Sequence, residues 1–421
     1  MSRSRLRRAR ATRSPAGSVR PPHILLIVEN VPLARDHRLQ KQAATLVAGG
    51  YRVSVICRAD PGNGRYAATR LHEYRAPADA TSKIGFIREY GYSWLLAAFL
   101  SVRVFVSDPF DAVQVSGTPD IYFAIGAPFK LLGRRLVLDQ RDLSPELYQL
   151  RYGLRRGIVF QLLCWLERES YRVADHVITV NQSLENVAYA RGGLRPGKVS
   201  VVGNGPVLAQ LRVMPMRPEL KKGRRYLCCW VGFMGPQDRV DVALRMVDHL
   251  VHVIGRTDCH FAFLGDGEAR AACEQLAADL GLENWVSFTG WVGQEAVSTY
   301  LSSADLGLEP NLEEIVSPVK GMEYMAYGLP FVSFDLRETR ALAGDAAVYA
   351  VSSDVIGFAR LVDKLLDDPE LRADMGRAGR RGVAQRLAWE RQESTYLKVY
   401  QRLLGRRRRD ALQHDRVAVE V

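Results

Sequence analysis

SPVKGMEYMAYGLPFVSFD, residues 317–335, is the stretch of sequence that decides the fold. Ser317 is predicted to be the N-cap of a short helix and Pro318 its first residue, where the missing proline N–H costs nothing. Gly328 is expected to end that helix, and the apolar FVSF that follows is typical of a buried strand. Such a unit indicates an open α/β sheet, with Asp335 at the carboxyl end of a strand, where these sheets bind ligands.

The predicted start of this helix has the features of a phosphate site. Free N–H groups of the turn from Ser317, the positive end of the helix dipole and the ammonium of Lys320 would all face an anion. Glu323 lies on the same helix face one turn deeper, where its carboxylate could accept hydrogen bonds from two vicinal ribose hydroxyls. The alternative is an ordinary Lys320–Glu323 pair on a solvated helix face. The Ser-Pro start and the Gly-Leu-Pro stop favour the nucleotide site.

Short apolar runs alternate with amphipathic stretches along the whole chain. Strands are predicted at residues 24–28, 53–57, 112–115, 135–139 and 176–180 in the first half, and at 226–231, 260–265, 286–290, 305–308 and 331–334 in the second. This alternation is typical of parallel sheets covered by helices on both faces. A chain of 421 residues exceeds the size of a single core, so two Rossmann-like domains facing a cleft are expected.

The predicted organisation has five parts. They are a basic tail (1–20), a first Rossmann-like domain on the acceptor side (21–203), a second one for the nucleotide (204–386), a closing helix (387–404) and a second basic tail (405–421).

The net charge of +12 is concentrated near the two ends of the chain. Seven arginines occur in the first twenty residues and four more form the run from Arg406 to Arg409. The remaining body is close to neutral, which argues against a nucleic-acid partner and predicts two flexible basic tails. Such tails could lie on an anionic membrane surface, or be solvated without any partner.

The cysteines indicate a reducing compartment. Six are present, with no CxxC and no Cys/His set at metal spacing, so a cytoplasmic protein without a metal site is expected. No secretory signal is expected at the N-terminus. The apolar run at 94–106 contains Arg103 and is too short to span a bilayer, so it is interpreted as a core helix, with an interfacial helix as the alternative.

Six segments, in this order, resemble glycosyltransferase family 4, whose members have the GT-B architecture and are typically retaining. They are DLSPELY (142–148), VVGNGP (201–206), VGFMGPQDRVD (231–241), FLGDGEAR (263–270), VSFTGWV (286–292) and EYMAYGLPFVSFDLRETR (323–340). The resemblance implies transfer of a hexosyl unit, with retention, from an NDP-sugar to a glycan, lipid-linked or small-molecule acceptor. The NDP-sugar would be a substrate, no cofactor is implied, and the closing helix would cross back onto the first domain.

The resemblance also implies a set of donor-binding loops. Gly232 and Gly235 would let backbone N–H groups approach the diphosphate. Gly265 and Gly267 would border the sugar, and Trp291 the base. Tight turn geometry is the alternative for the pair Gly265 and Gly267, and core packing is the alternative for Trp291.

This sequence departs from the family pattern in the second half. Phe233 and Asp238 stand where many members have an arginine and a lysine that hold the phosphates. Lys320 and the helix start would therefore supply more of the positive charge that binds the diphosphate. Asp238 is interpreted as the N-cap of the next helix. Ile315 stands at the first of two usual carboxylates, although Glu313 lies close by.

The first half lacks the histidines that related enzymes often carry near Gln114 and before the DLSPELY segment. In a retaining front-face substitution the leaving diphosphate can take the acceptor proton, so a titrating base is dispensable. Lys320, Arg141 and Asp142 are predicted to be the catalytic residues. The alternative makes Asp142 a helix cap and Arg141 its ion partner.

An acceptor-side cluster of Arg35, Asp36 and Arg38 is predicted where the first helix opens. Its alternative is a solvated helix start. Two other functions stay open: a GT-B nucleotide-sugar 2-epimerase, which needs acid and base groups at the sugar ring, and a non-catalytic subunit that binds a nucleotide sugar.

Overall fold

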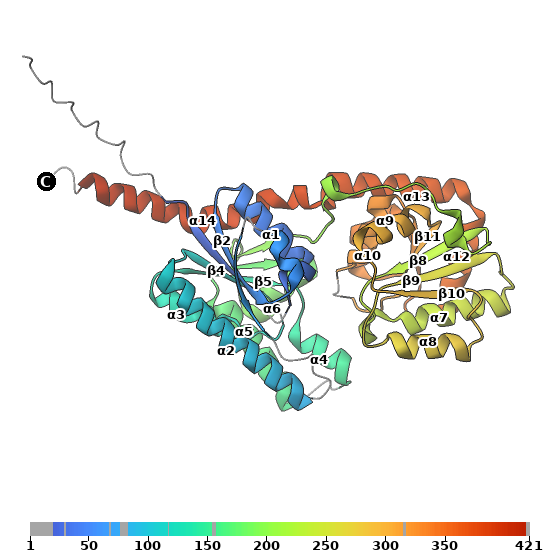
Figure 1. The fold of residues 1–421 in the computed structure, drawn as a ribbon, viewed down its shortest axis with the longest axis horizontal. Coiled ribbons are helices and arrows are strands. Elements are labelled where there is room, and N and C mark those ends of the chain that lie inside the picture. Colours follow the sequence, from blue (N-terminus) through green and yellow to red (C-terminus); the bar gives the residue numbers. More distant parts are fainter. Residues whose placement is uncertain are drawn as a thin grey trace, which may run out of the picture.

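The structure is a computed structural model that describes residues 20–28, 31–66, 69–75, 83–116, 118–153, 157–314 and 317–417. Two α/β domains lie side by side, and a long C-terminal helix extends from the second along the first (Figure 1). The predicted basic tail is described only at Arg20, since residues 1–19 lie outside the described part.

A parallel seven-stranded sheet in the order β3-β2-β1-β4-β5-β6-β7 forms the centre of the first domain. Its strands are β1 (His23–Val28), β2 (Arg52–Arg58), β3 (Arg70–Tyr74), β4 (Ala112–Ser116), β5 (Arg135–Gln140), β6 (His176–Thr179) and β7 (Val199–Val201). Its helices are η1 (Leu33–Arg35), α1 (His37–Ala48), η2 (Pro61–Arg65), α2 (Lys83–Ser107), α3 (Phe123–Leu131), α4 (Ser144–Tyr152), α5 (Ile158–Val173) and α6 (Gln182–Gly192). Helices α2, α3, α5 and α6 pack on the face opposite α1, as right-handed crossovers require.

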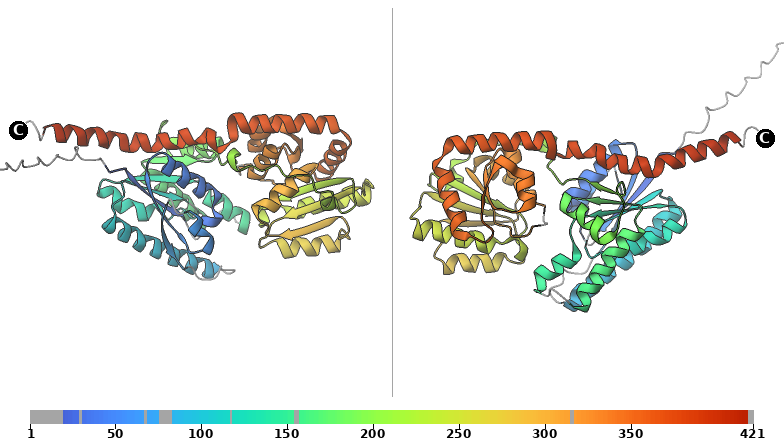
Figure 2. Two further views of the ribbon diagram at one scale, coloured as in Figure 1. Left: turned by 45° about the horizontal axis from the view of Figure 1, so that its top comes forward. Right: turned by 180° about the vertical axis from the view of Figure 1, so that it is seen from behind.

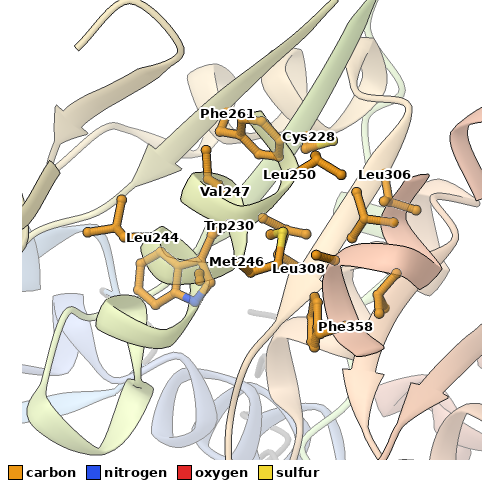
Figure 3. Close-up of a cluster of buried hydrophobic side chains, with 14 of the residues drawn as sticks. Cys228, Trp230, Leu244, Met246, Val247, Leu250, Phe261, Leu306, Leu308 and Phe358 are labelled. Carbon is orange, nitrogen blue, oxygen red and sulfur yellow. The ribbon is translucent and has the colours of Figure 1, made fainter. Parts of the chain in front are cut away.

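The second domain repeats this plan with a parallel six-stranded sheet in the order β10-β9-β8-β11-β12-β13. Its strands are β8 (Tyr226–Val231), β9 (Cys259–Leu264), β10 (Val286–Gly290), β11 (Leu306–Glu309), β12 (Phe331–Phe334) and β13 (Ala347–Ala350). Its helices, with those of the segment that precedes it, are η3 (Leu208–Gln210), η4 (Pro218–Lys221), η5 (Pro236–Asp238), α7 (Val240–Asp248), η6 (His249–Val253), α8 (Arg270–Asp279), α9 (Gln294–Ser303), α10 (Val319–Tyr327), α11 (Arg337–Ala343), η7 (Gly344–Ala346), α12 (Val355–Asp367), α13 (Pro369–Gly382) and η8 (Val383–Leu387). Trp230, Phe261 and Phe358 lie in one of its two buried clusters (Figure 3).

Helix α14 (Trp389–Val417) returns to the first domain, as expected. Trp389, Tyr396 and Tyr400 are buried there against α1 and the sheet. The helix continues through Arg406–Arg409 to Val417, so the predicted second basic tail is helical up to that residue. Residues 406–417 contain neither glycine nor proline, and nothing in them stops a helix.

The ten predicted strands are confirmed to within one residue at either end. Strands β3, β7 and β13 were not predicted. Each is a short edge strand with partly exposed residues, so it lacks the continuous apolar run that marks a central strand.

Helix α2 differs from the predicted core helix. Ala97 and Val104 are buried, but only 22% of its most apolar window lies inside the structure. Over Arg88–Ser107 it is the one helix of the described residues that is long and apolar enough to cross a membrane, by length and composition alone.

Candidate nucleotide-sugar site between the two domains

The candidate donor site lies where the strand order of the second sheet reverses. Strands β8 and β11 are neighbours there, although two other strands, β9 and β10, separate them in sequence. Gly232 follows β8, and α10 follows β11 after a connecting loop, so both leave the carboxyl edge of the sheet. Ligands of open α/β sheets bind in this crevice.

The helix of the 317–335 segment begins at Val319, and Pro318 is its N-cap. The predicted N-cap role of Ser317 is therefore wrong, because the amide of Val319 bonds to the carbonyl oxygen of Ser317 (2.9 Å) in a tight turn. Within the described residues, the amides of Lys320 and Gly321 have no acceptor. The first turn thus still offers free N–H groups to an anion. The predicted stop is confirmed by Gly328, whose φ is +70°.

Lys320 is held between two carboxylates. Its Nζ lies 2.6 Å from Asp238 Oδ1, 4.0 Å from Glu309 Oε1 and 5.3 Å from the ring centre of Trp230. Burial would lower the pKa of Lys320, but Glu309 and Asp238 raise it above its ordinary value. The ammonium is therefore charged, and a diphosphate must compete with Asp238 for it.

Asp238 was predicted to be the N-cap of the next helix, and this prediction is wrong. Arg239 is the N-cap of α7, and the carboxylate of Asp238 accepts from the amide of Gly235 (3.3 Å) in addition to Lys320. The loop η5 also contacts α4 of the first domain. Asp238 thus lies in the loop after β8 that was predicted to approach the diphosphate, at the boundary between the domains.

Glu309, at the end of β11, was missed by sequence reasoning. It is 1% exposed, and neither carboxylate oxygen has a hydrogen-bond partner in the part of the chain that the structure describes. Burial raises its pKa, which Lys320 opposes. Nothing in the sequence marks it, because a strand-end glutamate is ordinarily solvated.

Glu323 points from α10 toward the first domain. Burial raises its pKa, and Lys41 of α1 and Lys320 oppose that shift. No described residue hydrogen-bonds its carboxylate, so the two oxygens are available to hydroxyl donors. The electrostatic coupling to Lys41 shows that this helix face lies at the interface of the two domains (Figure 1).

Lys41 is a second cleft residue that sequence reasoning missed. Its Nζ donates to Asn204 Oδ1 and to the carbonyl oxygen of Gly205, both at 2.8 Å, and burial lowers its pKa to about 7. It therefore fastens α1 to the segment that joins the domains. A Cβ on Gly205 would lie 1.8 Å from the carbonyl oxygen of Leu387, so this crossing of two backbone segments requires glycine.

The glycine loops pack mainly against each other. Gly265 has a φ of +139°, and a Cβ there would lie 1.8 Å from the carbonyl oxygen of Gly232. A Cβ on Gly267 would lie 2.6 Å from the carbonyl oxygen of Met234. Turn geometry and loop contact therefore explain both glycines. Trp291 is 66% exposed, which excludes the core-packing alternative for it.

Arg141 links the start of α1 to the end of β5 on the cleft side of the first domain. It bonds Asp36 Oδ2 (2.5 Å) and Asp139 Oδ2 (3.0 Å), so the alternative in which Asp142 is its ion partner is wrong. Asp142 is not a helix cap either, since α4 follows Leu143 without a side-chain cap. Asp142 lies at the surface of the cleft. Partial loss of its hydration there raises its pKa, which Arg141 and Arg38 oppose.

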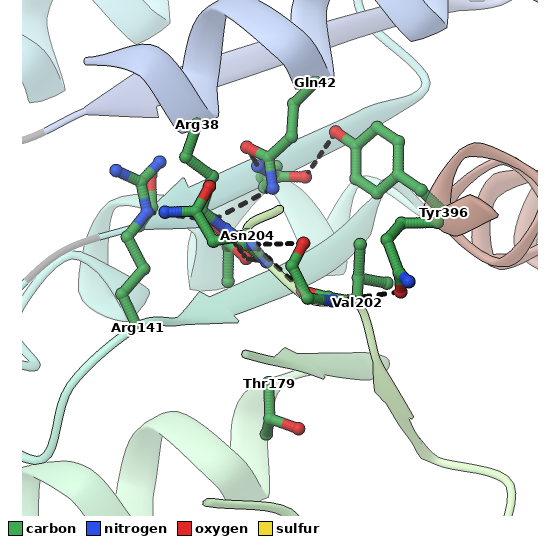
Figure 4. A network of polar contacts seen from close by, with 12 residues as sticks. Arg38, Gln42, Arg141, Thr179, Val202, Asn204 and Tyr396 are labelled. Carbon is green, nitrogen blue, oxygen red and sulfur yellow. Dashed lines mark hydrogen bonds and ion pairs between the residues drawn. The ribbon is translucent and has the colours of Figure 1, made fainter. Parts of the chain in front are cut away.

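The three residues of the predicted acceptor-side cluster do not share one surface, because Asp36 and Arg38 are buried and Arg35 is exposed. Arg38 is 3% exposed and bonds Asp139 and the carbonyl oxygens of Val202 (2.9 Å) and Gly203 (3.3 Å), so its position gives no support to acceptor binding (Figure 4). Asp36 is buried and caps α1 by accepting from the amide of Leu39, which contradicts a solvated helix start. Arg35 is exposed beside Asp60, 3.5 Å away.

A buried polar network continues from Asp139 to α14. Gln42 donates to Asp139 (3.0 Å) and accepts from Gln114 (3.0 Å), which in turn accepts from the hydroxyls of Tyr396 (2.9 Å) and Tyr400 (2.5 Å). Gln114, near which related enzymes often have histidine, thus holds the returning helix through the hydroxyls of Tyr396 and Tyr400.

A pocket opens beside Arg141 between the domains. Its lining residues come from the segment before α4, from α4 and α6, and from the loop after β11 of the second domain: Arg141, Asp142, Leu143, Glu146, Leu147, Gln149, Leu150, Gly153, Leu184 and Glu313. Three carboxylates and four leucines give it a mixed surface that suits a molecule with hydroxyl groups and an apolar part.

Comparisons with known proteins agree with this architecture. A glycosyl transferase 4-like domain matches residues 36–205, and a glycosyl transferases group 1 domain matches residues 225–368. The 2-deoxystreptamine glucosyltransferase of Streptomyces kanamyceticus is 25% identical over 75% of this chain and 84% of its own length. The MMP alpha-(1->4)-mannosyltransferase of Mycolicibacterium hassiacum is 28% identical over 39% of this chain and only 42% of its own length.

Solved structures show the same fold. Sucrose-phosphate synthase from Thermosynechococcus elongatus aligns with a TM-score of 0.73 at 15% identity, over 91% of this chain and 99% of its own. Anabaena HepE in complex with UDP-glucose aligns with a TM-score of 0.70 at 15% identity, over 89% and 98%.

The chain therefore belongs to the family-4 type of GT-B glycosyltransferases. It is a transferase that uses a nucleotide sugar. The roles of the individual cleft residues stay predictions.

Proposed function

We propose that the protein transfers a hexosyl unit from an NDP-sugar to a hydroxyl group of an acceptor in the pocket beside α4, with retention and without a metal ion. The observation that carries this proposal is the start of α10, where two free amides and Lys320 lie within one helical turn of Glu323, whose carboxylate has no described hydrogen-bond partner. Amides and ammonium suit the diphosphate, and the carboxylate suits the ribose. HepE, of the same fold, is described in complex with UDP-glucose.

The reaction needs no titrating protein base. The acceptor oxygen forms the new bond to C1 of the sugar while the bond from C1 to the diphosphate breaks on the same face. The departing phosphate oxygen takes the acceptor proton, and Lys320 with the first turn of α10 stabilises the diphosphate charge. Arg141 is fixed by Asp36 and Asp139 and positions the acceptor beside Asp142.

We also propose a cytoplasmic location, because all six cysteines are free. The acceptor is proposed to be a glycan, a lipid-linked sugar or a small molecule. Among named relatives, one is a 2-deoxystreptamine glucosyltransferase and another a lipopolysaccharide core biosynthesis glycosyltransferase from Rhizobium meliloti.

A donor panel tests the proposed reaction. The protein is incubated with UDP-, GDP- and dTDP-hexoses, a mixture of acceptors and a chelator, and the products are followed by mass spectrometry and NMR. We expect release of one free nucleoside diphosphate and an axial glycosidic bond from an axial donor. Epimerisation of the intact nucleotide sugar would identify a 2-epimerase, and binding without turnover would identify a non-catalytic subunit.

A further inference from the structure

The outer face of the first domain carries an unusual number of exposed apolar side chains. We define the apolar face by three helices, α2, the end of α3 and the first turns of α5. Its members on α2 are Tyr92, Leu95, Phe99, Val102 and Val106, those at the end of α3 are Leu131 and Leu132, and those on α5 are Ile158, Val159, Leu162 and Trp165. All are between 43% and 90% exposed.

These helices form one continuous surface. They belong to the same layer, since α2, α3 and α5 contribute to one buried cluster beneath them, and α3 contacts both α2 and α5. Helices α2 and α5 lie side by side along the edge of the domain (Figure 2). Monomeric soluble proteins rarely expose a contiguous apolar patch of this extent.

The exposed charges of the apolar face are mainly positive. Arg88, Arg103 and Arg168 are exposed on it. The carboxylates of Glu89 and Glu167, which belong to the same stretches of α2 and α5, are both buried, at 6% and 1% exposure. On α5, the partly exposed carboxylate of Glu169 is paired with the exposed guanidinium of Arg172 at 2.6 Å. Within the described turns of these helices, therefore, the surface offers apolar groups and an excess of cations.

We propose that the apolar face binds an anionic membrane surface, with α2 and α5 lying in the plane of the interface. The leucine, valine and phenylalanine side chains enter the acyl boundary, Tyr92 and Trp165 lie at the level of the headgroups, and the arginines contact lipid phosphates. Because Ala97 and Val104 hold α2 on the sheet, the helix lies on the membrane and does not cross it.

The charges favour a membrane over a second copy of the chain. A two-fold dimer through this face would bring the arginines of both copies together, while Glu169, the partly exposed carboxylate of the described turns, is already paired with Arg172. An anionic bilayer supplies both an apolar phase and phosphate groups. This surface is distinct from the basic tails and from the donor site.

Vesicle binding tests the proposal with full-length protein. We expect it to co-sediment with vesicles of phosphatidylcholine that contain about one third phosphatidylglycerol, and more weakly with phosphatidylcholine alone. A variant with Leu95→Ser, Phe99→Ser, Leu162→Ser and Trp165→Ser should lose binding by about a hundredfold or more, since each large side chain contributes to partitioning. A variant with Arg88→Gln, Arg103→Gln and Arg168→Gln should lose the preference for anionic lipid.

The matched control replaces exposed apolar residues elsewhere, with Val213→Ser, Met216→Ser, Val253→Ser and Val351→Ser, and should bind like the wild type. Thermal stabilisation by the nucleotide sugar should be the same in all variants, which shows that the domains are folded. Equal vesicle binding by the face variant would overturn the proposal and assign any binding to the basic tails. The proposal would also be overturned if the wild type did not bind vesicles but formed dimers, and if the face variant were monomeric. The apolar face would then be a protein interface.

Discussion

Replacing Glu323 by glutamine is expected to weaken binding of the preferred nucleotide sugar by about a hundredfold, because two charge-assisted hydrogen bonds to the ribose become neutral ones. The carboxylate has no described partner to lose, and it is only partly buried on α10. The fold should therefore be unaffected. Isothermal titration of the wild type and the variant with the same donor measures the change.

The control is Glu295→Gln in the first turn of α9, an exposed glutamate of the same domain. It should bind the donor with unchanged affinity. If the Glu323 variant also kept its affinity, the ribose would have to bind elsewhere, and the orientation of the donor proposed here would be wrong.

Replacing Asp139 by asparagine is expected to destabilise the first domain by about 3–5 kcal/mol, because the variant leaves two buried cations without their shared carboxylate. Asp139 is fully buried, and it bonds Arg38 (2.8 Å), Arg141 (3.0 Å) and Gln42 (3.0 Å). Burial alone would raise the pKa of Asp139, yet the two arginines hold it at about 2. Its stabilising contribution is therefore complete above about pH 4 and disappears as the pH falls toward 2.

Urea unfolding followed by circular dichroism measures this loss. The matched control is Asp374→Asn, which removes the exposed partner of Arg377 on α13 and should shift the midpoint by less than about 0.5 kcal/mol. A double variant, Arg38→Met with Asp139→Leu, should be less destabilised than the sum of its parts, since the pair is removed together. If Asp139→Asn and the wild type had equal urea midpoints of unfolding, the network around Asp139 would not stabilise the first domain.

The central strands could be predicted from the sequence because burial on both faces of a parallel sheet demands continuous apolar runs. Edge strands such as β3 were missed because they are partly exposed and lack such a run. Helix α2 shows the opposite error, since it was predicted to be buried and is largely exposed. The apolar composition of its run at 94–106 predicts a buried core helix. Only one side of the helix packs against the sheet, however, and the other side is exposed.

The helix α10 and the strand after it were predictable because their signals are local: a helix start and a helix stop, with a lysine and a glutamate three residues apart between them. The binding of the donor there stays a prediction. Glu309, Lys41 and the pairing of Asp238 with Lys320 could not be predicted, because they depend on which loops the topology brings together. The burial of Arg38 could not be foreseen for the same reason, since its partner Asp139 lies 101 residues away in sequence.

The measurement that tests the account most directly is the affinity of the matching nucleoside diphosphate for four proteins: the wild type, Lys320→Met, Asp238→Asn and the control Lys364→Met. Since Lys320 is the cation at the start of α10 and Asp238 competes for it at 2.6 Å, the two variants should change affinity in opposite directions. We predict a loss of at least about a hundredfold for Lys320→Met and a gain of roughly tenfold for Asp238→Asn, with Lys364→Met on α12 unchanged. Equal affinities in all four proteins would contradict the claim that the first turn of α10 and its lysine bind the diphosphate.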